Sequence, residues 1–139
     1  MKFLTKLMII CALALTAFAT PIRAAEGDPL FINLTTDDPH RANMAIQFSK
    51  TQNERGHPVT IFLNDRAVLV ASKVHAEKYA MHHKMLSDLA NKGATLLVCP
   101  MCMKHYGVKE SDLLPFVRQG NPEATGSALF MDNGKTLSW

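Results

Sequence analysis

The residues of this chain best suited to chemistry are two cysteines in the segment Cys99-Pro100-Met101-Cys102. They directly follow residues 94–98, an apolar run that is too short for a helix and predicts a buried strand. In an open α/β sheet, ligands and reactive groups gather at the carboxyl ends of the strands. A single free cysteine is often no more than a small core residue. Two thiols spaced C-x-x-C at a strand end favour a chemical role, because cysteine is usually present for its reactivity rather than for its packing.

Nucleophilic chemistry at sulfur requires a thiolate, because the protonated thiol is a poor nucleophile. If the chain beyond Cys99 turns helical, its free backbone N–H groups point at the Cys99 sulfur, and Lys104 and His105 add positive potential. Cys102 lies inside the turn, where a thiolate gains less from those donors. The spacing therefore predicts that the two thiols are unequal, with Cys99 as the nucleophile.

Two other interpretations of the same segment remain open. The segment holds five soft or borderline metal ligands within seven residues, which are Cys99, Met101, Cys102, Met103 and His105. Such a set suits Cu(I) or zinc, although a lone C-x-x-C supplies only two ligands and alternate methionines cannot all face one ion. The pair is also compatible with a thiol–disulfide redox couple, since C-P-x-C is a glutaredoxin-like tetrapeptide.

Residues 1–24 have the pattern of a signal peptide. Lys2 and Lys6 supply a positive start, residues 7–19 are apolar, and small residues follow. We expect cleavage after Ala24, which leaves residues 25–139 as one periplasmic or secreted domain. No other segment approaches the length of a membrane span, so we expect no membrane insertion after cleavage.

Removal of this segment changes the charge and cysteine balance. The whole chain has 15 basic and 12 acidic residues, and three of the basic residues lie within residues 1–24, so the remaining domain is neutral. Nucleic acids and anionic membranes require a concentrated basic face, so we expect no nucleic-acid partner. Only Cys99 and Cys102 remain, and a bridge across two residues is labile rather than stabilising.

The elements that position the cysteines alternate between strand and helix. Apolar β-branched runs predict strands at residues 30–34, 59–64 and 94–98, and helical periodicity predicts helices at residues 39–55 and 76–92. Asp38 is a good helix N-cap, and Pro39 suits the first helical position.

The remaining segments give weaker signals. Residues 65–74 are compatible with a helical turn or a mobile apolar loop, and helical turns are predicted at residues 103–106 and 111–114. Residues 125–131 are predicted to form a fourth strand, followed by a tight turn at 132–134 and a final strand at 135–139.

This order predicts a single three-layer α/β domain, with a mostly parallel sheet of about five strands and helices on both faces. In such a sheet the loops after the first three strands meet at one edge, to which the helix beginning near residue 39 points its positive end. The weaker candidates for substrate binding around the cysteines are Thr36, Asp38, Asn64, Lys104 and His105.

Three segments resemble the DsrE/DsrF-like family of small α/β sulfur-handling proteins. They are residues 33–39, residues 56–63 and the pattern Cys99-x-x-Cys102-Met103-x-x-x-Gly107-Val108, which is similar to the family's C-x-x-C-M branch. Together they extend the resemblance over essentially the whole of residues 25–139.

The resemblance implies a function for the cysteines. In the family's sulfur-relay members, a cysteine eight residues before a glycine accepts a sulfane sulfur as a persulfide and passes it to a partner thiol. Cys99 matches that position, because Gly107 lies eight residues on. The resemblance thus implies a sulfur carrier or sulfurtransferase, with a sulfur-donor or acceptor protein thiol as partner. It also implies a homo- or hetero-oligomer, often trimer-based, and we expect a homo-oligomer without a cofactor. Cys102 would resolve the persulfide, releasing sulfide and leaving a disulfide.

Overall fold

The computed structural model describes residues 27–139, so the predicted signal peptide lies outside the described residues. The strands are β1 (Leu30–Leu34), β2 (Val59–Leu63), β3 (Thr95–Val98), β4 (Arg118–Gln119) and β5 (Lys135–Ser138). The α-helices are α2 (Pro39–Glu54), α3 (Ala76–Asn91), α4 (Pro100–Tyr106) and α5 (Pro122–Leu129), and the short 3-10 helices are η1 (Asp65–Leu69), η2 (Lys73–His75) and η3 (Glu110–Asp112). Within this part of the chain, no helix is long and apolar enough to cross a membrane.

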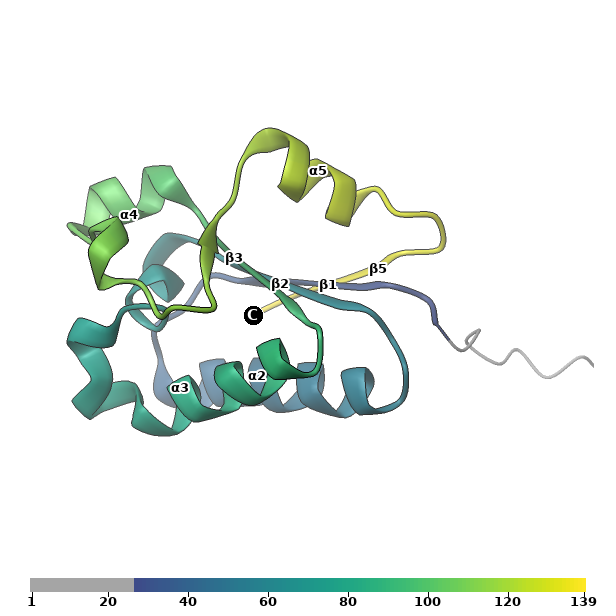
Figure 1. Cartoon of the computed structure of the whole chain (residues 1–139), viewed down its shortest axis with the longest axis horizontal. Coiled ribbons are helices and arrows are strands. Elements are labelled where there is room, and N and C mark those ends of the chain that lie inside the picture. Colours follow the sequence, from purple (N-terminus) through teal and green to yellow (C-terminus); the bar gives the residue numbers. More distant parts are fainter. Residues whose placement is uncertain (1–26) are drawn as a thin grey trace, which may run out of the picture.

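The five strands form one sheet in the order β4-β3-β2-β1-β5, and every neighbouring pair is parallel. Leu34 pairs with Leu63, and Leu63 pairs with Val98, so the three central strands end at the same edge. Figure 1 shows α2 and α3 below the sheet, α5 above it and α4 beside the carboxyl edge. The predicted three-layer α/β fold is confirmed.

The core lies between the sheet and helices α2 and α3. Alternate strand residues enter it, because successive side chains of a strand point to opposite faces; from β1 and β2 these are Leu30, Ile32, Leu34, Val59, Ile61 and Leu63. On α2 the buried side chains are mostly small, with Ala42 and Ala45 fully buried, which brings the helix close to the strands. This packing fixes the strand ends that carry the site.

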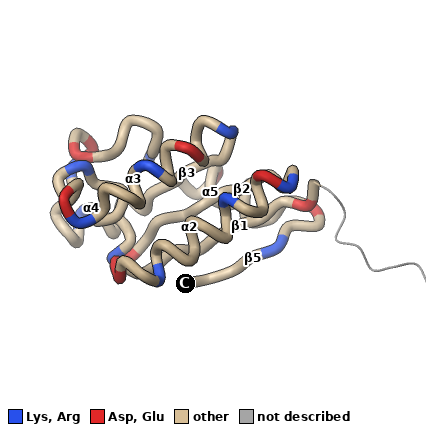
Figure 2. Tube along the Cα trace, turned by 90° about the horizontal axis from the view of Figure 1, so that it is seen from below, with Lys and Arg blue, Asp and Glu red and all other residues tan. Residues whose placement is uncertain are grey.

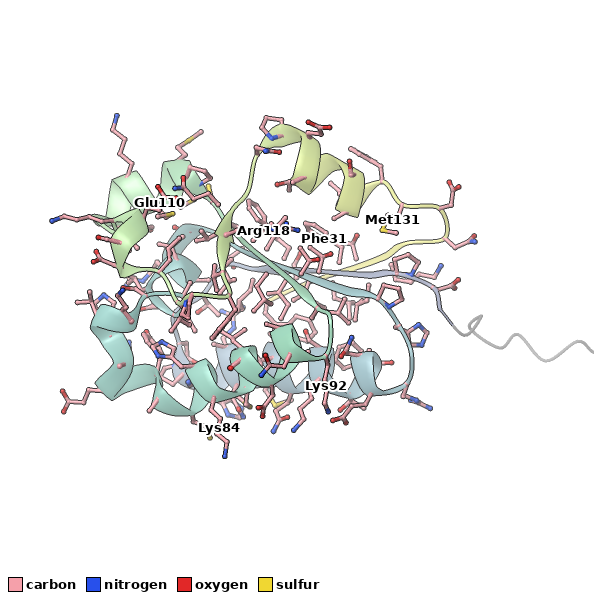
Figure 3. The ribbon with its side chains drawn as sticks, in the orientation of Figure 1. Phe31, Lys84, Lys92, Glu110, Arg118 and Met131 are labelled. Carbon is pink, nitrogen blue, oxygen red and sulfur yellow. The ribbon has the colours of Figure 1, made fainter. Side chains whose placement is uncertain are left out.

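The opposite face of the sheet is covered more thinly. Phe31 and Leu97 are buried on this face, whereas Phe62 is only half-buried. Figure 3 shows Phe31 between the sheet and α5, and its ring centroid lies 6.3 Å from that of Phe62. Since α5 has no fully buried residue, it leaves space beside the sheet.

The predicted strand at residues 125–131 is wrong, because this segment lies mostly in helix α5. Asn121 caps the helix by accepting a hydrogen bond from the backbone N–H of Ala124 at 2.7 Å, and Pro122 occupies the first helical position. The fourth strand is instead the two-residue β4, and β5 pairs in parallel with β1 rather than forming a hairpin.

The segment from residue 65 to residue 75 folds as η1 and η2. Four of its apolar residues are fully buried, namely Ala67, Val68, Val70 and Ala71. The helical-turn interpretation is therefore confirmed over the mobile-loop alternative. Helix α4 also begins earlier than the turn predicted at residues 103–106, directly after Cys99.

Candidate thiol site at the carboxyl edge of the sheet

Cys99 is both the continuation of β3 and the N-cap of helix α4. Its backbone N–H donates to the carbonyl of Leu63 at 3.0 Å, which extends the parallel ladder by one residue. Its carbonyl accepts the N–H of Met103 at 2.9 Å, the first bond of the helix. Pro100 follows as the first helical residue, where its missing N–H costs nothing. The thiol is therefore held at the point where strand changes to helix.

The Cys99 sulfur accepts two hydrogen bonds from Cys102. The backbone N–H of Cys102 donates to it at 3.3 Å, and the Cys102 thiol lies 2.8 Å away as a donor. Burial, followed by the hydrogen bond to Cys99, raises the pKa of the Cys102 thiol. Cys102 is thus held as the protonated partner, and both donors stabilise negative charge on Cys99.

A charged network joins the loops around these thiols. The carboxylate of Asp37, in the loop after β1, accepts two hydrogen bonds from Arg66 at 2.7 and 3.0 Å and lies 3.4 Å from the ammonium group of Lys78. The Arg66 hydrogen bond is the largest cause that lowers the pKa of Asp37 to about 2. Arg66 also lies over the ring of Tyr106, 5.7 Å from its centroid. The loops after β1 and β2 are thereby connected to helix α4.

Tyr106 connects this network to the cysteines. Its hydroxyl donates to the carboxylate of Asp65, and this bond raises the pKa of Tyr106. Asp65 has a φ of 46°, in the left-handed region. Its backbone forms a hydrogen bond with the Cys102 thiol, and this bond lowers the pKa of Cys102 and so partly offsets the effect of burial. Sequence reasoning missed Tyr106, although Cys102 and Tyr106 are one helical turn apart and so share a face of α4.

The weaker predicted site residues fall into two groups. Thr36 and Asp38 stabilise the start of α2: the Thr36 hydroxyl accepts the N–H of Asp38 at 3.1 Å, and the Asp38 carboxylate accepts the N–H of Arg41 at 2.8 Å. Neither residue lines the pockets described below. Asn64 donates to the side-chain oxygen of Asn33 and lies beside Cys102.

Lys104 and His105 lie in the last turn of α4, at the opposite end of the helix from Cys99. The ring of His105 packs edge-on against Tyr106 with centroids 4.7 Å apart. The positive charge of Lys104 complements the negative end of the helix. The backbone of Cys102, and not these side chains, provides the hydrogen-bond donor at the Cys99 sulfur.

The two thiols open onto different pockets. Cys99 lines a pocket of about 320 Å³, here called the apolar pocket, with Phe62, Pro100, Met101, Gly120, Asn121, Pro122 and Thr125. Cys102 lines a pocket of about 280 Å³, here called the polar pocket, with Asn64, Asp65, Met101, His105 and Tyr106. The contribution of residues 120–125 was missed in the sequence because no element was predicted for residues 120–124 and residue 125 was predicted to begin a strand.

Residues 27–139 contain no group of three or more His, Cys, Asp or Glu side chains placed to hold a metal ion. Of the predicted alternative ligands, Cys99 and Cys102 are adjacent. Met103 is buried in the core, and His105 packs against Tyr106 in the last turn of α4. Of the five candidate ligands, the structure therefore brings only the two cysteine sulfurs into direct contact.

The fold and the site together define a class of protein. It is a parallel α/β domain with a pair of thiols at the point where the third strand meets a short helix. The chain belongs to the DsrE/DsrF-like family, whose model matches residues 30–130. It is 33% identical over 88 residues to the uncharacterized protein MJ0989 of Methanocaldococcus jannaschii, a match that covers 60% of this chain and 77% of that protein.

Two solved structures have a similar fold. One is a protein of unknown function, MTH1491 of Methanobacterium thermoautotrophicum, with a TM-score of 0.67 and 13% identity. The other is the ychN protein of E. coli, with a TM-score of 0.58 and 14% identity. Each match covers 81% of this chain and 99% of the other chain. At these identities the likeness concerns the fold alone.

Proposed function

We propose that this protein carries sulfane sulfur as a persulfide on Cys99, with Cys102 as the resolving thiol. The observation that carries the proposal is the Cys99 sulfur at the N-cap of α4, which accepts both the N–H and the thiol hydrogen of Cys102. Membership of a family generally associated with sulfur relay supports it. The partner is a protein thiol that donates or accepts the sulfur.

Loading is an exchange at sulfur. The Cys99 thiolate attacks the outer sulfur of a persulfide donor, the donor's S–S bond breaks, and the donor leaves as a thiolate with the electron pair. A new S–S bond now joins Cys99 to the transferred sulfur, and no net oxidation has occurred. The two hydrogen bonds from Cys102 stabilise the attacking thiolate.

Release follows one of two routes. A partner thiolate can take the outer sulfur and leave Cys99 as a thiolate. Alternatively, Cys102 attacks the Cys99 sulfur, the bond to the outer sulfur breaks, and hydrogen sulfide leaves with the proton of Cys102. The second route forms a Cys99–Cys102 disulfide, which an external dithiol must reduce before the next cycle.

Intact-mass spectrometry with two variants tests this function. Reduced protein incubated with inorganic polysulfide should gain one sulfur mass, and Cys99→Ser should gain none. Cys102→Ser should gain the same mass and hold it for longer, because the internal route to sulfide release is removed. Loading of Cys99→Ser equal to that of wild type would disprove the assignment.

The second candidate function is thiol–disulfide exchange, which is supported by the 2.8 Å separation of the two sulfur atoms. A redox protein would take no sulfur from the donor and would cycle between dithiol and disulfide with a dithiol partner. The third is soft-metal binding, which predicts stoichiometric copper or zinc in the purified protein and protection of both thiols from alkylation. The same mass spectra distinguish the three.

Export is part of the proposal. The charge, apolar run and small residues of residues 1–24 support cleavage after Ala24 and a periplasmic or secreted location. Full-length protein expressed in a Gram-negative host should be recovered from the periplasmic fraction beginning at Ala25. Recovery in the cytoplasm with an intact N-terminus would contradict it.

A further inference from the structure

The side chains of the apolar pocket determine which sulfur donors can reach Cys99, because the proposed nucleophile forms part of the pocket wall. Besides Cys99, its side chains are an aromatic ring from β2, two prolines, a methionine, an asparagine and a threonine, and none of them is charged. The side-chain oxygen of Asn121 is already used as the cap of α5. The pocket therefore offers little to a charged group.

A glycine forms part of the wall of this pocket. Gly120 is buried, and its N–H donates to the carbonyl of Val98 at 2.8 Å. A Cβ atom at this position would lie 3.0 Å from the hydroxyl oxygen of Thr125 and 3.4 Å from the ring of Phe62. The absence of a side chain at Gly120 thus leaves space between α5 and β2, beside Cys99.

The polar pocket differs in the polar groups that line it. It contains the carboxylate of Asp65, the hydroxyl of Tyr106 and the imidazole of His105, and it reaches Cys102 rather than Cys99. Met101, whose side chain is 81% exposed, contributes to both pockets and lies between their openings. A molecule that reaches Cys99 through its own pocket therefore meets mostly apolar side chains, whereas one that reaches Cys102 meets the carboxylate of Asp65 and the polar groups of Asn64, Tyr106 and His105.

We propose, on the basis of the persulfide function above, that the apolar pocket binds the organic part of the sulfur donor. The donor is then a small hydropersulfide, R–S–SH, whose substituent R is uncharged and apolar, and the protein thiol of the proposed function is the acceptor. The volume of about 320 Å³ lies at the low end of the range for small-ligand pockets, roughly 300–1,000 Å³.

Binding in this pocket sets up the transfer. The substituent R packs against Phe62 and Pro122 and places the outer sulfur next to Cys99. The Cys99 thiolate forms a bond to that sulfur, the S–S bond of the donor breaks, and R–S⁻ leaves with the electron pair and takes up a proton. The atoms and electrons balance without an oxidant or reductant.

The test compares three donors on the reduced full chain: benzyl hydropersulfide, glutathione hydropersulfide and inorganic polysulfide. The rate of sulfur gain at Cys99 is measured by mass spectrometry and divided by the rate of the same donor with free cysteine, which removes differences in intrinsic reactivity. We expect benzyl hydropersulfide to exceed glutathione hydropersulfide by about tenfold or more, the range that an apolar pocket provides.

Two variants and a matched control examine the pocket itself. Gly120→Ala should lower the benzyl hydropersulfide rate by roughly tenfold and leave the inorganic polysulfide rate near wild type. Met101→Lys, at an exposed position where folding is not at risk, should lower the ratio of benzyl to glutathione rates. Gly126→Ala, in α5 with open space around it, should leave all three rates unchanged.

The outcomes separate this inference from the function on which it rests. If inorganic polysulfide loads Cys99 but benzyl hydropersulfide has no advantage over glutathione hydropersulfide, the donor assignment is overturned and the persulfide function stands. If Gly120→Ala and Met101→Lys each change the loading rates of all three donors by the same factor, the donor assignment is also overturned. If none of the donors loads Cys99, the persulfide function itself fails.

Discussion

Cys99 and Cys102 differ in chemistry although their sulfur atoms are 2.8 Å apart. Burial and the hydrogen bond to Cys99 raise the pKa of the Cys102 thiol, so Cys102 remains protonated near neutral pH. With limiting alkylating reagent at neutral pH, we expect Cys99 to be labelled first. Labelling of Cys102 should increase only at pH values above the usual titration range of a thiol, as peptide mass spectrometry would measure.

The same experiment has a clear contradictory outcome. If both thiols are labelled at equal rates between about pH 6 and about pH 9, the pair is symmetric, and if Cys102 is labelled first, the assignment of Cys99 as nucleophile is wrong. A symmetric pair favours the redox or metal interpretation. Cys102→Ser is the matched control, because it leaves Cys99 as the only cysteine within residues 25–139.

Asp37 makes a contribution to stability that depends on pH. Its pKa is lowered to about 2, chiefly by the Arg66 hydrogen bond. A lowered carboxyl pKa stabilises the fold above the unfolded-state value and is lost as pH falls from about 4 to about 2. Because Arg66 and Lys78 are about half exposed, we expect Asp37→Asn to lower the free energy of unfolding at pH 7 by only about 1 kcal/mol.

Urea unfolding at pH 7, 4 and 3 measures this effect. The difference between wild type and Asp37→Asn should shrink as the pH falls, and a difference that is constant across this range would contradict the assignment. Glu54→Gln is the control, because the Glu54–Lys92 pair is exposed on both sides and should contribute no measurable stability.

At the scale of elements, helix α4 must remain intact for Cys102 to donate to Cys99. Gly107 ends this helix with a φ of 72°, a left-handed conformation that costs other residues energy. Gly107→Ala should therefore destabilise the protein by about 1 kcal/mol. Gly126→Ala lies inside α5 with open space around it, and it should stabilise the protein by roughly 0.5–1 kcal/mol.

Thermal or urea unfolding of both glycine variants should thus give shifts of opposite sign. Equal shifts of the same sign would show that chain flexibility, and not the left-handed conformation of Gly107, determines the effect. Gly107→Asn should recover part of the loss, since asparagine tolerates this conformation better than alanine.

The long elements were predictable from sequence, and the short ones were not. Residues 30–34 and 59–63 are continuous apolar strands, and Asp38 followed by Pro39 marks the start of α2, so their bounds could be predicted closely. The same signal, Asn121 followed by Pro122, marks α5, but the apolar residues within 125–131 favour a strand when the sequence is considered alone. The two-residue β4 has too few residues for any periodicity and exists only through its pairing with β3.

The site was predictable to the same extent. The position of the two cysteines directly after the third strand was predictable, because the strand and the C-x-x-C segment are adjacent in sequence. The apolar pocket is not local: Gly120 and Thr125 reach Cys99 only because β4 pairs beside β3 and α5 folds back over the sheet (Figure 1). Such a placement depends on tertiary contacts that no spacing in the chain reveals.

On the molecule as a whole, an apolar surface lies at the end of α5. It consists of the consecutive residues Leu129, Phe130 and Met131, and Phe130 is 82% exposed. Figure 3 shows Met131 in the loop after α5, and Figure 2 shows basic and acidic residues interspersed over the elements rather than gathered in one basic face. Exposed apolar clusters of this kind mark protein interfaces.

We therefore propose that the protein assembles as a homo-oligomer through this surface. Light scattering at micromolar concentration should give a multiple of the mass of one chain. Phe130→Asp should shift the protein toward the monomer without unfolding it, because the side chain is exposed within the chain. Wild-type protein with the mass of a single chain would contradict the proposal, and Lys84→Asp, at an exposed position on α3 away from this surface, is the control (Figure 3).

The proposed function depends on Cys99 holding the transferred sulfur. The most direct measurement is to load the reduced wild-type protein with inorganic polysulfide, trap it at once with an alkylating reagent, and locate the added sulfur by fragmentation of the peptide that contains both cysteines. We expect the additional sulfur on Cys99, with a Cys99–Cys102 disulfide appearing as sulfide is released. Additional sulfur on Cys102, an equal distribution over both thiols, or no added sulfur in a protein purified with stoichiometric copper or zinc would contradict it.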